Sequence, residues 1–131
     1  MLPQSDANYG GYMKAARLSN VMAMLVPIRI RANEYRSIHG DWPDEMKDIR
    51  LKASEMNDGE NITAVKMGKD GAIFAFLDER FGKDKLVVYK PRVIMGGMNT
   101  RWECHANLSP GTVYSQCEEK QDLAFDGKEQ Q

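Results

Sequence analysis

The two cysteines are the residues whose chemistry is easiest to interpret. Cys104 and Cys117 are separated by twelve residues and are the only cysteines in the chain. This spacing matches neither the CxxC redox motif nor paired zinc knuckles. We therefore expect a disulfide, with two unpaired buried thiols as the alternative. Closing a loop of this size would stabilise the fold by about 3 kcal/mol and is typical of an oxidising compartment, such as a periplasm or the cell exterior.

Other reactive side chains do not form a recognisable catalytic pattern. Neither His39 nor His105 has a Cys, Asp or Glu at ligand or triad spacing, and no GxSxG, P-loop or HExxH motif occurs. The stretch Asn57–Asn61 offers oxygen ligands without the spacing of an EF-hand, so we interpret it as a turn. The nine methionines are expected to fill the core. The sequence predicts a non-enzymatic protein without a metal or another cofactor.

A group of basic residues near two aromatic side chains suggests a second kind of chemistry. Basic groups beside Tyr89 and Trp102 on adjacent strands would suit nucleic-acid binding, because cations contact phosphates and rings stack on bases. The alternative is that these residues protect strand edges from pairing with another chain. The candidate DNA contacts are Lys83, Lys85, Lys90, Arg92 and Arg101.

The length and composition of the chain indicate one globular domain that positions these residues. A chain of 131 residues is large enough for one hydrophobic core, and 42% hydrophobic with 28% charged residues is typical of a globular protein. No apolar run approaches the roughly 18 residues that would span a bilayer. The net charge of −1 announces neither a polyanion-binding nor a strongly acidic function. Residues 1–40 and 61–117 carry an excess of basic groups, whereas 41–60 and 118–131 carry an excess of acidic groups.

The strongest periodic pattern predicts a helix from about Tyr12 to His39. Gly40 is suited to end this helix, and Pro43 prevents it from resuming. Pro27 lies inside the pattern, so we expect a bend there without a break. At 1.5 Å per residue the helix would be about 42 Å long, so part of it must project or meet a neighbour. The apolar stripe consists of Leu18, Val21, Leu25, Ile28, Ala32 and Tyr35.

Four strand candidates follow the helix and predict an antiparallel sheet. Short turns at 68–71 and 81–85 separate the first three, as in a meander. The expected fold class is therefore α+β, with the long helix packed on a four-stranded antiparallel sheet. Residues 1–11 are interpreted as a cloning remnant or disordered start, 12–117 as the globular domain and 118–131 as a frayed polar tail. The strand candidates are Ile62–Met67, Ala72–Leu77, Leu86–Tyr89 and Thr100–Cys104.

Four features in this order carry a resemblance to a known family. They are the segment Tyr12–Arg17, the amphipathic helix with its proline, Gly40-Asp-Trp-Pro43, and Trp102-Glu-Cys104 followed by Cys117. Over residues 12–117 the chain resembles the type IV pilins, and most of all their type IVa branch. The resemblance implies a helix on a four-stranded sheet and a surface loop closed by two C-terminal cysteines. It also implies a preceding apolar helical half that anchors the precursor in the inner membrane.

The resemblance implies a structural role for the whole protein. A pilin assembles with copies of itself, through the pilus assembly machinery, into extracellular filaments that serve adhesion, motility or DNA uptake. A minor pilin or a pseudopilin that primes assembly is the alternative with the same fold. The loop closed by the cysteines would be exposed on the filament. Its candidate contacts with a surface ligand are Ser109, Pro110, Gly111, Thr112 and Tyr114.

The helix supplies the candidate contacts between subunits. Its basic side chains could set the subunit register against the acidic segments, and a solvated helix face with scattered charge is the alternative. The candidate packing residues are Leu18, Val21, Leu25, Pro27, Arg29 and Arg31.

Overall fold

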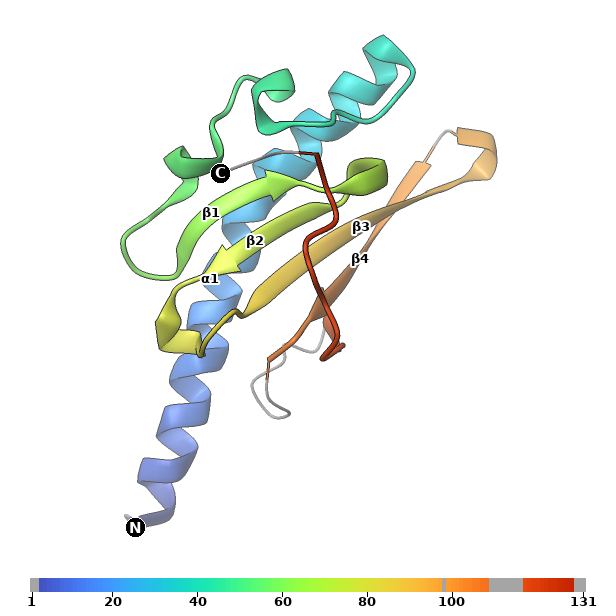
Figure 1. The fold of residues 1–131 in the computed structure, drawn as a ribbon. Coiled ribbons are helices and arrows are strands. Elements are labelled where there is room, and N and C mark those ends of the chain that lie inside the picture. Colours follow the sequence, from blue (N-terminus) through green and yellow to red (C-terminus); the bar gives the residue numbers. More distant parts are fainter. Residues whose placement is uncertain (1–2, 98, 109–116, 129–131) are drawn as a thin grey trace.

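The computed structural model describes residues 3–97, 99–108 and 117–128. One long helix, α1 (Pro3–His39), lies against one face of a five-stranded sheet (Figure 1). This arrangement confirms the predicted α+β class. The strands, in sheet order and in chain order, are β1 (Ile62–Met67), β2 (Ile73–Leu77), β3 (Leu86–Ile94), β4 (Asn99–Ala106) and β5 (Cys117–Glu119).

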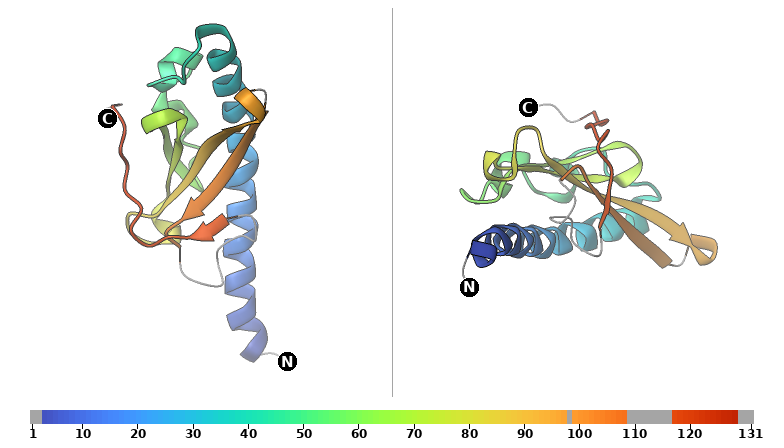
Figure 2. Two further views of the ribbon diagram at one scale, coloured as in Figure 1. Left: turned by 90° about the vertical axis from the view of Figure 1, so that its right-hand side faces the viewer. Right: turned by 90° about the horizontal axis from the view of Figure 1, so that it is seen from below.

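Helix α1 is held to the sheet by the predicted apolar stripe. Leu18, Val21, Leu25 and Ala32 are 0% exposed, and Ile28 is nearly so. The helix continues through Pro27 without a break, as expected. It begins at Pro3 and not near Tyr12, so residues 3–11 are part of the helix. Its N-terminal end extends beyond the sheet, as Figure 1 and the left-hand view of Figure 2 show. Among the described residues, no helix is long and apolar enough to cross a membrane.

The C-terminal end of α1 is fixed by the glycine and tryptophan that follow it. Gly40 adopts the left-handed conformation (φ 83°) and its N–H donates to the Arg36 carbonyl, which ends the helix as predicted. The ring of Trp42 then packs against the backbone of Gly71 on the sheet side. A Cβ atom on Gly71 would lie 2.6 Å from that ring, so only glycine leaves room for Trp42.

The first four strands form the predicted antiparallel meander. The β1 bounds match the prediction, whereas β3 continues to Ile94 in place of Tyr89 and β4 is longer than predicted at both ends. Residues Lys90–Ile94 of β3 pair with Asn99–Glu103 of β4. The pairing of β3 with β2 ends at Tyr89, so this part of β3 has no described strand on its other side. We call this extension of the two strands the strand arm. It projects past α1 in the right-hand view of Figure 2.

The predicted four-stranded antiparallel sheet is wrong in one respect, because a fifth strand makes the sheet mixed. β5 pairs with β4 in parallel, with Cys104 opposite Cys117 and Ala106 opposite Glu119. The disulfide joins the first of these pairs and so holds the short strand in register. A three-residue Cys-Glu-Glu segment has no alternating or β-branched pattern, which is why the sequence did not predict it.

The expectation of a frayed tail after Cys117 is wrong for residues 118–128. This segment crosses the sheet face that lies opposite α1 (Figure 1). The Phe125 ring packs edge-on against Phe74 at 5.3 Å, and Lys66 lies over Phe125 with its ammonium 5.6 Å from the ring centre. Gly127 passes so close to Met67 that an added Cβ would lie 2.4 Å from its carbonyl oxygen. The tail therefore covers a second, smaller apolar cluster that includes Phe74 and Val88.

Candidate functional site

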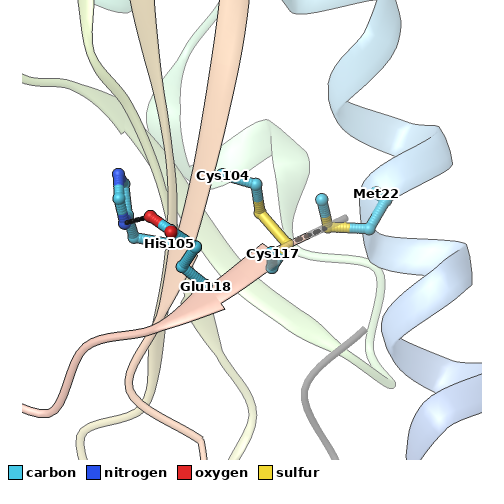
Figure 3. Close-up of a disulfide and its surroundings, with 5 residues drawn as sticks. All are labelled: Met22, Cys104, His105, Cys117 and Glu118. Atoms are coloured by element: carbon cyan, nitrogen blue, oxygen red, sulfur yellow. Dashed lines mark hydrogen bonds and ion pairs between the residues drawn. A yellow bond between two sulfur atoms is a disulfide. The ribbon is translucent and has the colours of Figure 1, made fainter. Parts of the chain in front are cut away.

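The cysteines form the predicted disulfide, and they connect the sheet to the helix. Cys104 and Cys117 are nearly buried, and the Cys117 sulfur lies 3.9 Å from the Met22 sulfur on α1 (Figure 3). This is a packing contact, because a disulfide sulfur has no hydrogen to donate. On the opposite side of the sheet, His105 Nδ1 lies 3.6 Å from the carboxylate of Glu118. The disulfide is therefore part of the helix–sheet core.

The loop that the disulfide closes contains the candidate surface contacts. Ser109, Pro110, Gly111, Thr112 and Tyr114 all lie outside the described residues. Their role stays a prediction from the resemblance.

Three of the candidate subunit contacts on α1 face the protein's own sheet. Leu18, Val21 and Leu25 have no exposed surface. Their side chains are already covered, so they are not available to a second subunit in this fold. Their physical role is to hold α1 on the sheet.

A second apolar stripe lies on the opposite side of α1. Ala23, Val26, Pro27 and Ile30 are all exposed, with Val26 at 37% and Ile30 at 55%. They follow the spacing i, i+3, i+4 and i+7, which places them on one helix face. We call these four residues the outer stripe. Only Pro27 among them was a predicted subunit contact, although the helical spacing of the other three in the sequence also indicates a shared face.

The two arginines proposed to set subunit register have partners inside the domain. The Arg29 guanidinium lies over the Tyr89 ring, 4.6 Å from its centre, and Arg31 donates to the Ile49 carbonyl at 3.1 Å. Arg29 Nε is buried and has no hydrogen-bond partner among the described residues. Replacing either arginine by glutamate would therefore disturb the fold, and such variants do not report on assembly alone.

The five candidate DNA contacts are divided between two places. Lys83 and Lys85 lie at the start of β3, where the Lys85 ammonium donates to the Asn107 carbonyl. Arg92 lies seven residues further along, about 23 Å away at 3.3 Å per residue. Lys90, Arg92 and Arg101 share one face of the strand arm, because they alternate with Tyr89 and Cys104, which face the core. The structure thus brings three of the five basic residues together.

The polar hollow beside the lower part of α1 shows no catalytic arrangement. It has a volume of about 630 Å³ and lies between Arg17, Asn61 and Arg80. The Arg80 guanidinium donates to the Glu60 carbonyl at 2.8 Å. Across the described ranges, no three or more His, Cys, Asp and Glu residues are grouped so that they could hold a metal ion.

The predicted turn at 57–61 is organised by one carboxylate. Asp58 Oδ1 accepts hydrogen bonds from the N–H groups of Glu60, Asn61 and Ile62, at 2.7 to 2.9 Å. Burial alone raises the pKa of Asp58, but the backbone donors led by Ile62 outweigh it, so its pKa lies below the ordinary value. These three hydrogen bonds hold the backbone of the turn around the carboxylate.

Asp58 makes the stability of the fold depend on pH. Its folded pKa lies below the unfolded value of about 3.9, so ionised Asp58 stabilises the fold above that pH. This contribution is lost as the pH falls through the folded pKa. We expect Asp58→Asn to lower the free energy of unfolding by about 1 kcal/mol at neutral pH, and the difference from the unchanged protein to shrink in acid. Urea denaturation across this pH range measures the difference, with Asp122→Asn at an exposed position as the control. A difference that stays constant down to acid pH would contradict this account.

Comparison with known proteins identifies no family for this chain. No protein-family model matches the sequence. No curated protein matches it at a significant level.

Proposed function

We propose that this chain is a structural subunit of a bacterial type IV pilus, which assembles with copies of itself into surface filaments. The observation that carries the proposal is the outer stripe. Helix α1 is apolar on two opposite faces, and only the inner face is covered by the sheet. An apolar stripe at helical spacing is typical of a face that packs against another element, so the exposed outer stripe supports packing against another helix.

Three further features support a filament subunit. The N-terminal end of α1 extends beyond the sheet, where a neighbouring helix has access to it. A disulfide suits passage through the periplasm to the cell surface. The sequence resemblance adds the partners of the proposal, which are the inner membrane before assembly and the pilus assembly machinery. Adhesion, motility and DNA uptake are uses that such a filament would serve.

The experiment that tests this function is immunogold electron microscopy of the source cells with an antibody against this domain. Label spaced along whole filaments is the result that we expect for a major subunit. Label confined to the envelope or to filament tips would favour a minor pilin or a pseudopilin. Cells on which no filament binds the antibody would contradict the filament role.

DNA binding by the strand arm is the second candidate function. Arg92 and Arg101 lie directly opposite each other, an arrangement that costs stability unless an anion is near. Arg92 has an ion pair with Glu103 at 3.0 Å, whereas Arg101 forms no ion pair among the described residues. Retention on heparin that Arg101→Ala weakens would support this function, and no retention at low salt would remove it.

A further inference from the structure

The strand arm ends in apolar side chains that are exposed to solvent. Met95 is 71% exposed and Ile94 is 37% exposed. The arm extends away from the helix–sheet core, so its own domain does not cover the tip (Figure 2). Isolated exposed apolar residues are common on protein surfaces, but two adjacent ones at the end of a projecting hairpin form a compact knob.

A groove that includes exposed apolar surface lies at the C-terminal end of α1. It has a volume of about 440 Å³ and lies between α1 and the segment 48–50. Its apolar members include Ile38, which is 77% exposed, and Ile49, and the Tyr35 ring stacks on His39 with 4.1 Å between ring centres. Its acidic members are Glu34 and Asp48.

The arm is basic, and the groove offers an acidic side chain with which the arm can pair. The arm carries Lys90, Arg92 and Arg101 against one acidic residue, Glu103. The groove has as many arginines, Arg31 and Arg50, as acidic residues, Glu34 and Asp48. The side chains of Glu34 and Arg101 form no ion pair in the part of the chain that the structure describes. Pairing of Arg101 with Glu34 of a second copy would favour contact between copies in one register.

The two surfaces lie on opposite flanks of α1. Arg29 and Arg36 lie on the flank of α1 that is next to the arm. The Arg29 guanidinium lies over the Tyr89 ring, and that of Arg36 lies over the Trp42 ring. Arg31 and Tyr35 line the groove on the other flank. In Figure 1 the segment after α1 lies to the left of its upper end, and the arm lies to its right. The arm of one copy can therefore reach the groove of a second copy placed beside it in the same orientation.

We propose that the arm tip of one subunit, Ile94 and Met95, docks into the helix-end groove of a second copy of this chain. Arg101 then lies near Glu34 of the second copy, and Met95 packs on Ile38. Because the two surfaces differ, the contact is heterologous and repeats from copy to copy without closing into a two-fold dimer. The inference rests on the proposed self-assembly and names a pair of surfaces that make it directional.

Disulfide trapping between two purified variants tests this contact. Ile38→Cys and Met95→Cys each add one exposed thiol, while Cys104 and Cys117 remain joined to each other. Random coupling of an equal mixture gives about twice as much mixed dimer as either symmetric dimer, and we expect the oxidised mixture to exceed that ratio several-fold. The double variant should give a ladder of multimers. Mass spectrometry of tagged proteins distinguishes these products.

A matched thiol at an exposed position away from the groove measures random collision. Ser54→Cys with Met95→Cys supplies this control. Trapping of Ile38→Cys with Met95→Cys no faster than in the control would overturn the proposal. Adding Arg101→Glu to the Met95→Cys protein should slow trapping several-fold, and adding Glu34→Arg to the Ile38→Cys protein should restore it. A loss without restoration would overturn the charge pairing.

The outcome is distinct from that of the filament test. Antibody-labelled filaments on cells together with no specific trapping would reject the arm–groove contact and leave the pilus function standing. Specific trapping together with no labelled filaments would retain the contact between copies and reject the filament role.

Discussion

Replacing Leu25 by alanine should lower the free energy of unfolding by about 2 to 5 kcal/mol. Leu25 is 0% exposed and belongs to the core cluster between α1 and the sheet. Alanine would lose the apolar contacts of the side chain and leave a cavity that a closely packed core cannot fill. Urea denaturation followed by circular dichroism measures the change.

The adjacent residue Val26 provides the control for this variant. It belongs to the outer stripe and is 37% exposed, so Val26→Ala should change the free energy of unfolding by no more than about 0.5 kcal/mol. The contrast between neighbouring positions separates the two faces of α1. Equal losses in both variants would contradict the assignment of one covered and one uncovered face.

Removing the disulfide should have an effect of similar size. The double variant Cys104→Ala and Cys117→Ala should lose about 3 kcal/mol, because the loop between two cysteines that are 13 residues apart is no longer closed in the unfolded chain. The short β5 strand also loses the link that holds it beside β4. Its contact with Met22 on α1 loosens at the same time.

Two measurements check the disulfide prediction. Denaturation gives the loss of stability, and reduction of the unchanged protein should shift its midpoint to that of the double variant. Amide hydrogen exchange should become faster in β5, because its hydrogen bonds to β4 are no longer held in place. A reductant that leaves the midpoint unchanged would show that the disulfide does not stabilise the fold.

Local signals explain which parts of the fold the sequence predicted well. Three features each depend on residues that are near one another in the chain. They are the apolar stripe of α1 that faces the sheet, the end of the helix at Gly40 and the turn at 68–71. The α+β class and the order of the first four strands follow from them. The disulfide was predictable because only two cysteines are present.

The features that the sequence did not predict depend on contacts between distant residues. β5 exists because a disulfide and the β4 edge hold three residues that have no strand pattern. The tail packs on the sheet through Phe125, whose partners Phe74 and Phe76 lie about fifty residues earlier in the chain. A composition that is mostly polar conceals this single aromatic anchor.

The candidate site was predicted only in part, and the reason is physical. A helix stripe in the sequence shows that one face is to be covered, but it does not say whether the sheet or another subunit covers it. Leu18, Val21 and Leu25 were assigned to subunit packing, whereas they lie in the domain core. The outer stripe became recognisable once the inner face was accounted for.

The central claim is that the outer stripe of α1 joins subunits into a filament, and a charge on that stripe tests it directly. Ile30 is 55% exposed, so Ile30→Asp should leave the domain folded. Electron microscopy of cells that produce only this variant should then show no filaments, because assembly would bury an unpaired carboxylate. Ser54→Asp, which places the same charge at an exposed position of the short 3-10 helix Ala53–Met56, should leave filaments as abundant as before. Normal filaments with Ile30→Asp would contradict the claim.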